Sequence, residues 1–386
     1  MNMQIPFFEL NRLNEEEGVE LINAFQNFLK SGRYILGPEV DRFEKHLHEI
    51  LSKNPEDCGG VIGCNSGTDA LILSLLASEV GIGDEVLTVS HTAIPTLAAI
   101  RAVGALPIFI DIDPDTWLMD TTGLNDKITP KTKAIILVHL YGNVLPVPDI
   151  IESLKTIGRT DIAVIEDVAQ AQGACYHGQA VGTMGRMGAF SFYPTKNLGA
   201  LGDGGAVYCS KSQDAVRVRA LRSYGQENQG EVKFPRGINS RLDEIQATIL
   251  NLRLNHFKAW NDKKAVLMEK YQHELKGMPI HFQKVLPGTI PAWHLCVIKL
   301  NDNQTRDHLR HFLAQSGIET LIHYPRATHT QTPFSFTPTS LPITENLTER
   351  ILSLPLNSAL KDLEQDYIIQ KIKEYFDNRR AKHLES

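Results

Sequence analysis

The chain has 386 residues, of which 42% are hydrophobic and 22% are charged, and its formal net charge is −6. This length exceeds what one hydrophobic core usually supports, so we expect a large domain with a smaller partner. The acidic balance and the lack of a basic stripe exclude nucleic acid as an expected partner.

The N-terminus carries no signal-peptide pattern, and no uninterrupted apolar run is long enough to cross a bilayer. The five cysteines are scattered and form no Cys-x-x-Cys pair. We therefore expect a cytoplasmic protein that binds no membrane and has neither a metal site nor a disulfide framework.

The N-terminal region, before the first predicted strand, is expected to be irregular at first and then helical. Residues 1–15 read as irregular, and an amphipathic helix is predicted over 21–29, ending at Ser31-Gly32. The loop 32–38 has a glycine at each end, and a helix with apolar residues at helical spacing follows from Glu39. This loop is either a simple connector or a segment that faces a substrate.

Short apolar strands alternate with helical stretches between residues 60 and 210, which predicts a doubly wound, mostly parallel sheet of the α/β class. The strands are expected at 61–64, 85–90, 106–111, 134–139, 161–165, 189–193 and 205–209. Ligands of such sheets bind beyond the carboxyl ends of the strands. The side chains at or just past these ends are Ser66, His91, His139, Asp167 and Lys196.

The sequence pattern changes near residue 253, where the alternation of short strands and helices has ended. A charged helix (256–275), an alternating segment (293–300), a helix (305–315), several prolines and a C-terminal helix (363–376) follow. We therefore predict a large cofactor-binding domain over residues 1–252 and a smaller α+β domain over residues 253–386.

Lys196 lies in a glycine-rich loop between two of the predicted strands. An amine on a flexible stem, held by a tight backbone, is a candidate Schiff-base nucleophile, although most loop lysines are merely solvated. Ser191 precedes it by five residues, and Asp167 stands at another strand end. This combination is typical of a pyridoxal phosphate site.

A second motif is the turn Asn-Ser-Gly-Thr-Asp at 65–69, between a strand and a long apolar helix. Free amides and the positive end of a helix make such a turn an anion site. The alternative is a plain helix N-cap by Ser66 or Thr68.

Four segments together resemble the DegT/DnrJ/StrS sugar aminotransferases, which are fold-type I pyridoxal phosphate enzymes. They are Ser-Gly-Thr-Asp-Ala (66–70), Glu-Asp-Val-Ala-Gln (166–170), Ser-Phe-Tyr-Pro-Thr-Lys-Asn-Leu-Gly (191–199) and Gly-Ile-Asn-Ser-Arg-Leu-Asp-Glu-Ile-Gln (237–246). The resemblance covers nearly the whole chain, and the motifs occur in the family's order.

The resemblance implies a role for each matching residue. Lys196 matches the Schiff-base lysine that also moves the proton, and Asp167 matches the carboxylate that pairs with the pyridine nitrogen. Gln170 matches the residue beside the ring, and the phosphate contacts are Gly67, Thr68 and Ser191. Asn239 matches an asparagine that reaches the phosphate of the neighbouring subunit, which implies a homodimer with shared active sites.

Two segments depart from the family's pattern. The position that usually stacks an aromatic on the ring holds Ala93, and His91 is the candidate replacement. The loop 226–235, which follows Tyr224-Gly225, lacks the usual basic and aromatic pair. We therefore do not assign the family's contacts with the substrate diphosphate to residues of this loop.

The expected reaction is a transfer of an amino group from L-glutamate to a nucleotide-linked keto-deoxysugar. The segment His323-Tyr324-Pro325, with His329, resembles enzymes that act on dTDP-3-keto-6-deoxyhexoses, so Tyr224, His323 and His329 are the candidate substrate contacts. Both histidines are equally well explained by packing.

Three alternatives remain open: a 4-keto sugar aminotransferase, a cofactor-dependent sugar dehydratase and a non-catalytic cofactor-binding regulator. Lys196 argues against the dehydratase branch, which carries histidine there, and no basic recognition helix supports a regulator that binds DNA. A nicotinamide dehydrogenase would need Gly-x-Gly-x-x-Gly after the first strand, where the chain has none.

Overall fold

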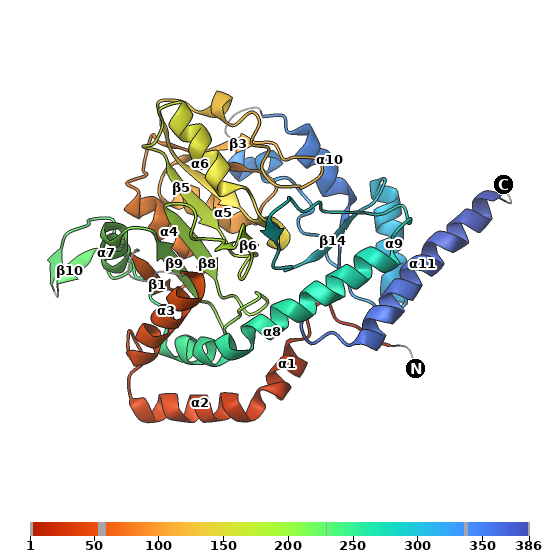
Figure 1. Ribbon diagram of the computed structural model, residues 1–386, viewed down its shortest axis with the longest axis horizontal. Helices are drawn as coiled ribbons and strands as arrows, with labels where there is room; N and C mark the ends of the chain where they lie inside the picture. Colours follow the sequence, from red (N-terminus) through yellow and green to blue (C-terminus); the bar gives the residue numbers. More distant parts are fainter. Residues whose placement is uncertain (1–2, 53–58, 229, 336–338, 385–386) are drawn as a thin grey trace.

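The computed structural model describes residues 3–52, 59–228, 230–335 and 339–384 (Figure 1). Its main sheet has seven strands in the order β1-β9-β8-β5-β4-β2-β3. The strands are β1 (Gly60–Cys64), β2 (Glu85–Val89), β3 (Leu106–Ile110), β4 (Thr132–Val138), β5 (Ala163–Asp167), β8 (Met187–Ser191) and β9 (Gly205–Cys209). Strand β9 runs in the opposite direction to the other six strands of this sheet. The predicted doubly wound, mostly parallel sheet is confirmed.

The helices largely follow the predicted pattern, but α7 and α10 were not predicted, and two further regions differ from the prediction. Their bounds are α1 (Leu10–Glu16), α2 (Gly18–Ser31), α3 (Pro38–Leu51), α4 (Gly67–Ala77), α5 (Ile94–Ala102), α6 (Val147–Thr156), α7 (Ser212–Leu221), α8 (Glu244–Glu274), α9 (Asn303–Gln315), α10 (Pro342–Arg350) and α11 (Asp362–Leu384). The prediction that residues 1–15 are irregular is wrong over α1, which Arg12 ties to Glu364 through two hydrogen bonds. The helix predicted over 256–275 is the second part of the longer α8.

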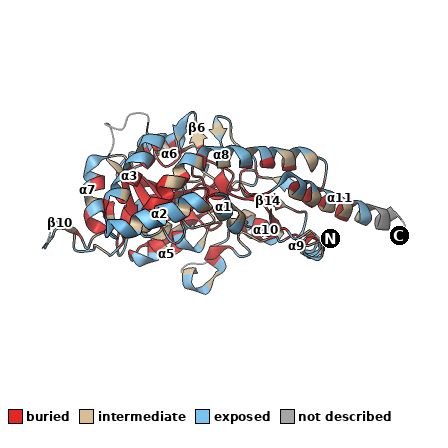
Figure 2. Ribbon diagram, turned by 90° about the horizontal axis from the view of Figure 1, so that it is seen from below, coloured by how far each residue is buried: buried red, intermediate tan, exposed pale blue. Residues whose placement is uncertain are grey.

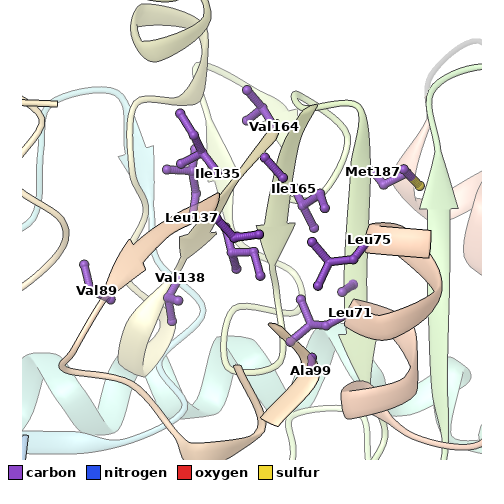
Figure 3. Packing of buried hydrophobic residues seen from close by; sticks show 14 of the residues in the cluster. Leu71, Leu75, Val89, Ala99, Ile135, Leu137, Val138, Val164, Ile165 and Met187 are labelled. Carbon is purple, nitrogen blue, oxygen red and sulfur yellow. The ribbon is translucent and has the colours of Figure 1, made fainter. Parts of the chain in front are cut away.

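The sheet buries both of its faces, as successive strand residues point to opposite sides. In β8, Ala189 joins a cluster with Leu71 and Leu75 of α4, whereas Phe190 joins a cluster with Phe43 of α3. Figure 3 shows Leu71 and Leu75 packed toward Ile165 and Leu137 of the central strands. This double coverage explains why the strands read as continuous apolar runs in the sequence.

A second hydrophobic cluster lies around the three-stranded sheet β12-β14-β15, formed by His281–Phe282, Cys296–Lys299 and Ile351–Leu354. It packs α9 and α11 against the later turns of α8, and Ile5 from the N-terminal segment also belongs to it. The predicted boundary between residues 252 and 253 falls inside α8, which runs unbroken between the two regions (Figure 1). The exact division into domains therefore stays a prediction.

Two small sheets complete the fold. The hairpin of β10 (Gln226–Asn228) and β11 (Glu231–Val232) projects from the body beside α7 (Figure 1). The other joins β6 (Cys175–Tyr176), β7 (Gln179–Ala180) and β13 (Thr289–Ile290). In the described ranges, no helix has the length and apolar character needed to cross a membrane, and no cluster of His, Cys, Asp and Glu is arranged to hold a metal.

Candidate active site

The carboxyl edge of the main sheet gathers the side chains that the sequence singled out. Asp167 ends β5, Ser191 ends β8, and Lys196 lies in the loop that leads from β8 to β9. The turn that follows β1 opens α4 beside β8, since Gly67 meets Ser191 directly. Topology, rather than closeness in sequence, thus places these groups at one edge.

The turn at Ser66 and Gly67 combines both interpretations of the motif. Ser66 is the N-cap of α4, and its hydroxyl accepts a hydrogen bond of 3.1 Å from the Asp69 amide. A Cβ added at Gly67 would lie 2.5 Å from the Ser191 Cβ and 3.0 Å from its hydroxyl oxygen. Only glycine therefore lets the start of α4 lie this close to Ser191, so a hydroxyl lies beside the N-terminus of a helix, where anions commonly bind.

Asp167 is a buried carboxylate held by two donors. Its Oδ2 accepts a 3.0 Å hydrogen bond from the Thr96 hydroxyl, and its Oδ1 accepts one of 3.1 Å from the Ala169 amide. Burial raises the pKa of Asp167, while these two donors and the charge of Lys196 act in the opposite direction. A carboxylate in this setting is stabilised further by a cationic partner.

Lys196 is half-buried, and its amide donates a 2.8 Å hydrogen bond to the Tyr193 carbonyl, which shapes the loop around it. Burial lowers the pKa of its amine to about 8, although the nearby Asp167 carboxylate works to raise it. The amine is therefore partly neutral near physiological pH, as a nucleophile or a general base requires.

Gln170 belongs to a hydrogen-bonded network beside Asp167. Its Oε1 accepts from the Tyr141 amide at 2.8 Å, and its Nε2 donates to the Tyr324 hydroxyl at 3.0 Å. The Tyr141 hydroxyl in turn contacts His91 Nε2 at 2.7 Å and donates to the His323 carbonyl. The network fixes the Gln170 amide and brings Tyr324 close to Asp167, whose charge helps burial to raise the Tyr324 pKa.

His91 is not free to serve as a stacking ring in this arrangement. It is 1% exposed and meets Tyr141 edge-on, and burial lowers the pKa of His91 to about 3. Ala93, two residues later, is the N-cap residue of α5 and is half-exposed.

Tyr224 lies between α7 and β10, and Asn239 lies between β11 and α8. Both are exposed, Tyr224 at 51%, and Asn239 pairs with Ser223 in an isolated bridge. The neighbouring Ser240 is buried and donates a 2.7 Å hydrogen bond to Asp69 in the first turn of α4. Asn239 is thus on the surface, and the residue that follows it in the sequence, Ser240, is bonded to the first turn of α4.

The two predicted substrate histidines have different surroundings. His323 Nδ1 contacts the Ser353 hydroxyl at 2.9 Å, and burial followed by the charge of Lys196 lowers the pKa of His323 to about 4. Both ring nitrogens of His329 are engaged, with Ser90 at 2.7 Å and Glu345 at 3.0 Å. The structure thus couples His323 with Lys196, whereas the His329 ring packs between β2 and α10.

Sequence reasoning missed Thr96, Lys264 and His294. Thr96 follows His91-Thr92 by one helical turn on α5, and its hydroxyl also contacts Thr92 at 2.8 Å. One sequence feature could have pointed to Thr96: α5 begins just after a strand of the same sheet that carries Asp167. Lys264 and His294 come from distant parts of the chain, and no local pattern marks them.

The residues present fit pyridoxal phosphate. The glycine cradle at the start of α4 suits a phosphate, the buried Asp167 suits a protonated pyridine nitrogen, and the Lys196 amine suits a Schiff base with an aldehyde.

Comparisons with known proteins agree with this geometry. The dTDP-3-amino-3,4,6-trideoxy-alpha-D-glucose transaminase of Streptomyces venezuelae is 38% identical and covers 96% of each chain. The dTDP-3-amino-3,6-dideoxy-alpha-D-galactopyranose transaminase of Aneurinibacillus thermoaerophilus is also 38% identical, covering 96% of this chain and 99% of its own.

Solved structures of aminotransferases are also similar to this chain. S. venezuelae DesV in complex with a ketimine intermediate superposes with a TM-score of 0.90 at 37% identity, covering 96% of this chain and 98% of its own. The sugar aminotransferase Spr1654 from Streptococcus pneumoniae in its PLP form has a TM-score of 0.85 at 25% identity, covering 93% and 96%. The family model for DegT/DnrJ/EryC1/StrS aminotransferases matches residues 15–373. The chain therefore belongs to this family of pyridoxal-phosphate-dependent aminotransferases, as the Lys196 and Asp167 motifs predicted.

Proposed function

We propose that the protein transfers the amino group of L-glutamate to the 3-keto group of a dTDP-linked 6-deoxyhexose. The observation that carries the reaction class is the pair formed by Lys196 and Asp167 at the carboxyl edge of the sheet, with the pKa of Lys196 lowered to about 8. The sugar class rests on the two relatives named above as transaminases of dTDP-3-amino sugars.

Each proposed site residue has a distinct task. When bound, pyridoxal phosphate supplies an electron sink for proton removal from the donor's α-carbon. Lys196 Nζ takes that proton and returns it, and its lowered pKa suits both steps near neutral pH. Asp167 would keep the ring nitrogen of the cofactor protonated, and Gln170 would lie beside the ring.

The phosphate is proposed to bind at the cradle. The amides of Gly67 and Thr68 open α4, and the Ser191 hydroxyl lies against Gly67. Donors fixed by the backbone cost no side-chain entropy on binding, so they anchor the cofactor while the other end reacts. The Ala93 side chain is too small to stack on the cofactor ring as an aromatic residue would. The substrate contacts proposed are Tyr224, His323 and His329.

A homodimer with shared active sites is supported by two exposed apolar surfaces. Helix α2 has no buried residue (Figure 2), and four of its apolar residues, Val19, Ile22, Phe25 and Leu29, are 49–75% exposed along it. Such an uncovered apolar face is typical of a subunit interface.

The second surface surrounds the start of α8. Ile35 bridges to Asp243, and the Leu201 amide donates to Gln246, so both exposed side chains lie near the first turn of α8. Asn239 precedes the same helix and is exposed. We propose that this surface meets the partner subunit and that Asn239 reaches the partner's cofactor phosphate. A cytoplasmic location belongs to the same proposal, because the donor and nucleotide sugar are cytoplasmic metabolites.

An absorbance experiment tests the reaction and the substrate together. The protein loaded with pyridoxal phosphate is treated with L-glutamate and then with a panel of 3-keto and 4-keto nucleotide sugars. We expect glutamate to bleach the band of the bound cofactor and a dTDP-3-keto sugar to restore it. Restoration by a 4-keto sugar alone would replace the proposed substrate, and a band that no amino acid bleaches would favour a non-catalytic cofactor-binding regulator.

A further inference from the structure

A small cavity lies on the side of the Lys196 loop that faces the N-terminal segment and α8. Its walls include Glu9, Lys196, Arg253, Lys264, His294 and Asn357. Its volume is about 50 Å³, compared with the roughly 10–15 Å³ that a cavity needs to hold one water molecule. The cavity therefore has room for one small polar group beside the reactive lysine, and not for a sugar nucleotide.

Lys264 is the unusual member of this wall. It is 5% exposed, and within the described part of the chain neither a hydrogen bond nor an ion pair reaches its amine. Burial lowers the pKa of Lys264 to about 7, and no nearby charge contributes to that change. A buried amine without a partner is costly, so a site that keeps one there calls for an anionic partner from outside the chain.

The other charged groups of the wall already have partners. Arg253 bonds to Glu17, to Asn14 and to the Gly199 carbonyl. Glu9 lies 3.5 Å from Arg12. Glu9 is therefore engaged elsewhere, and Arg253 is itself a cation, so neither one balances the charge of Lys264.

His294 is a further titratable residue of this wall, and the charges of both lysines act on it. It is 5% exposed, its Nδ1 lies 3.3 Å from Asn197 Oδ1, and burial together with the charges of Lys196, Lys264 and His323 keeps its pKa well below the usual range. The ring is therefore neutral and adds no charge. Lys196 and Lys264 remain as the two amines without an ion-pair partner among the described wall residues.

We propose that this cavity binds a carboxylate group of the amino donor, with the Lys264 ammonium as its counter-ion. The inference rests on the proposed function, since it names the contact that the amino acid makes. A carboxylate matches the volume of the cavity and supplies the charge that Lys264 lacks. Binding there places the rest of the amino acid next to Lys196, which must move its α-proton.

The test measures binding of 2-oxoglutarate, the keto acid counterpart of glutamate, to the protein loaded with pyridoxal phosphate. This form has no amino group to give, so calorimetry reports binding alone. We expect Lys264→Met to weaken the affinity about tenfold or more, which is the loss of one charge-assisted hydrogen bond. Lys263→Met is the matched control, because Lys263 is the exposed neighbour on the same helix and its removal should leave the affinity unchanged.

A labelling experiment on the unaltered protein covers the case in which Lys264→Met fails to fold. Trace acetylation followed by mass spectrometry compares the rates at Lys264 and Lys263. 2-Oxoglutarate should slow labelling of Lys264 and not of Lys263. Equal rates with and without the keto acid, or equal affinity in Lys264→Met, would overturn the inference.

The outcomes also separate this inference from the proposed function. If glutamate bleaches the cofactor band and Lys264→Met binds 2-oxoglutarate normally, the inference alone fails. If the unaltered protein neither loses its band with glutamate nor binds 2-oxoglutarate, the proposed donor fails and the inference fails with it.

Discussion

Gly67 and Ser191 are in such close contact that a methyl group on the first would lie 2.5 Å from the Cβ of the second. The contact joins the start of α4 to the end of β8, two elements that are more than a hundred residues apart in the sequence. It fixes the distance between the backbone amides of the turn and the Ser191 hydroxyl, and so defines the proposed phosphate cradle.

Gly67→Ala is expected to widen this cradle. The added methyl must push α4 and β8 apart, which should cost about 1–3 kcal/mol of stability and weaken cofactor binding more than tenfold. Titration of the cofactor-free protein with pyridoxal phosphate, together with thermal unfolding, measures both effects. Gly123→Ala is the control, since a methyl there meets nothing within 4 Å; equal cofactor affinity in both variants would contradict the cradle.

The pKa of Lys196 gives a prediction about pH. Only the neutral amine attacks an aldehyde, and a pKa of about 8 makes half of the Lys196 side chains neutral at pH 8. An ordinary lysine would be less than about 1% neutral there. Capture of pyridoxal phosphate by the cofactor-free protein should therefore accelerate as pH rises, with a midpoint near 8. Stopped-flow absorbance measures this rate, and a midpoint above 10 would show that the lysine is not desolvated.

Lys196→Ala is expected to abolish both the absorbance band of the bound cofactor and turnover. No other lysine in the described part of the chain is placed beside Asp167, whose charge acts on the Lys196 amine. Circular dichroism should show an intact fold, because the Lys196 side chain makes no hydrogen bond to another residue in the described part of the chain. Measurable turnover in this variant would refute the role of Lys196.

Thr96 is expected to act through Asp167. Thr96→Val removes the 3.0 Å hydrogen bond to the carboxylate with little change of volume, so the pKa of Asp167 should rise further. A less anionic Asp167 holds the ring proton more weakly, so turnover should fall about tenfold and the pH dependence of the cofactor spectrum should shift. Thr88→Val is the control: its hydroxyl is also buried but bonds to the Ile136 carbonyl. Loss of turnover without a spectral shift would indicate a merely structural role for Thr96.

A mixing experiment tests the shared site. If Asn239 serves the partner's cofactor, a hybrid of Lys196→Ala and Asn239→Ala chains contains one site in which both residues are intact. Random mixing should then restore about a quarter of the unaltered activity, although each variant alone is impaired. Mixtures that never exceed the average of the two separate variants would place Asn239 in its own subunit's site or in neither.

The sequence alone determined the sheet and the main motifs, because these depend on local patterns. The strand predicted over 205–209 is β9, residue for residue. The strand predicted over 161–165 lies two residues early, since β5 runs from Ala163 to Asp167, and its last two residues are acidic and were taken as the strand end. Lys196 and Asp167 were found because a glycine-rich loop and an acidic strand end are visible without a fold.

Only the tertiary structure decided which residues that are far apart in the sequence contact one another. Thr96 supports Asp167 across 71 positions of sequence, and His329 is held by Ser90 across 239, so its type and neighbours in sequence could not distinguish a packed ring from a substrate contact. Helix α8 continues past residue 252 because its two halves pack on different hydrophobic clusters. Lys264 reads as one more lysine in a charged helix until folding buries it beside Lys196. Local periodicity specifies elements, whereas burial and charge at a given residue arise from chain segments that meet only when the molecule folds.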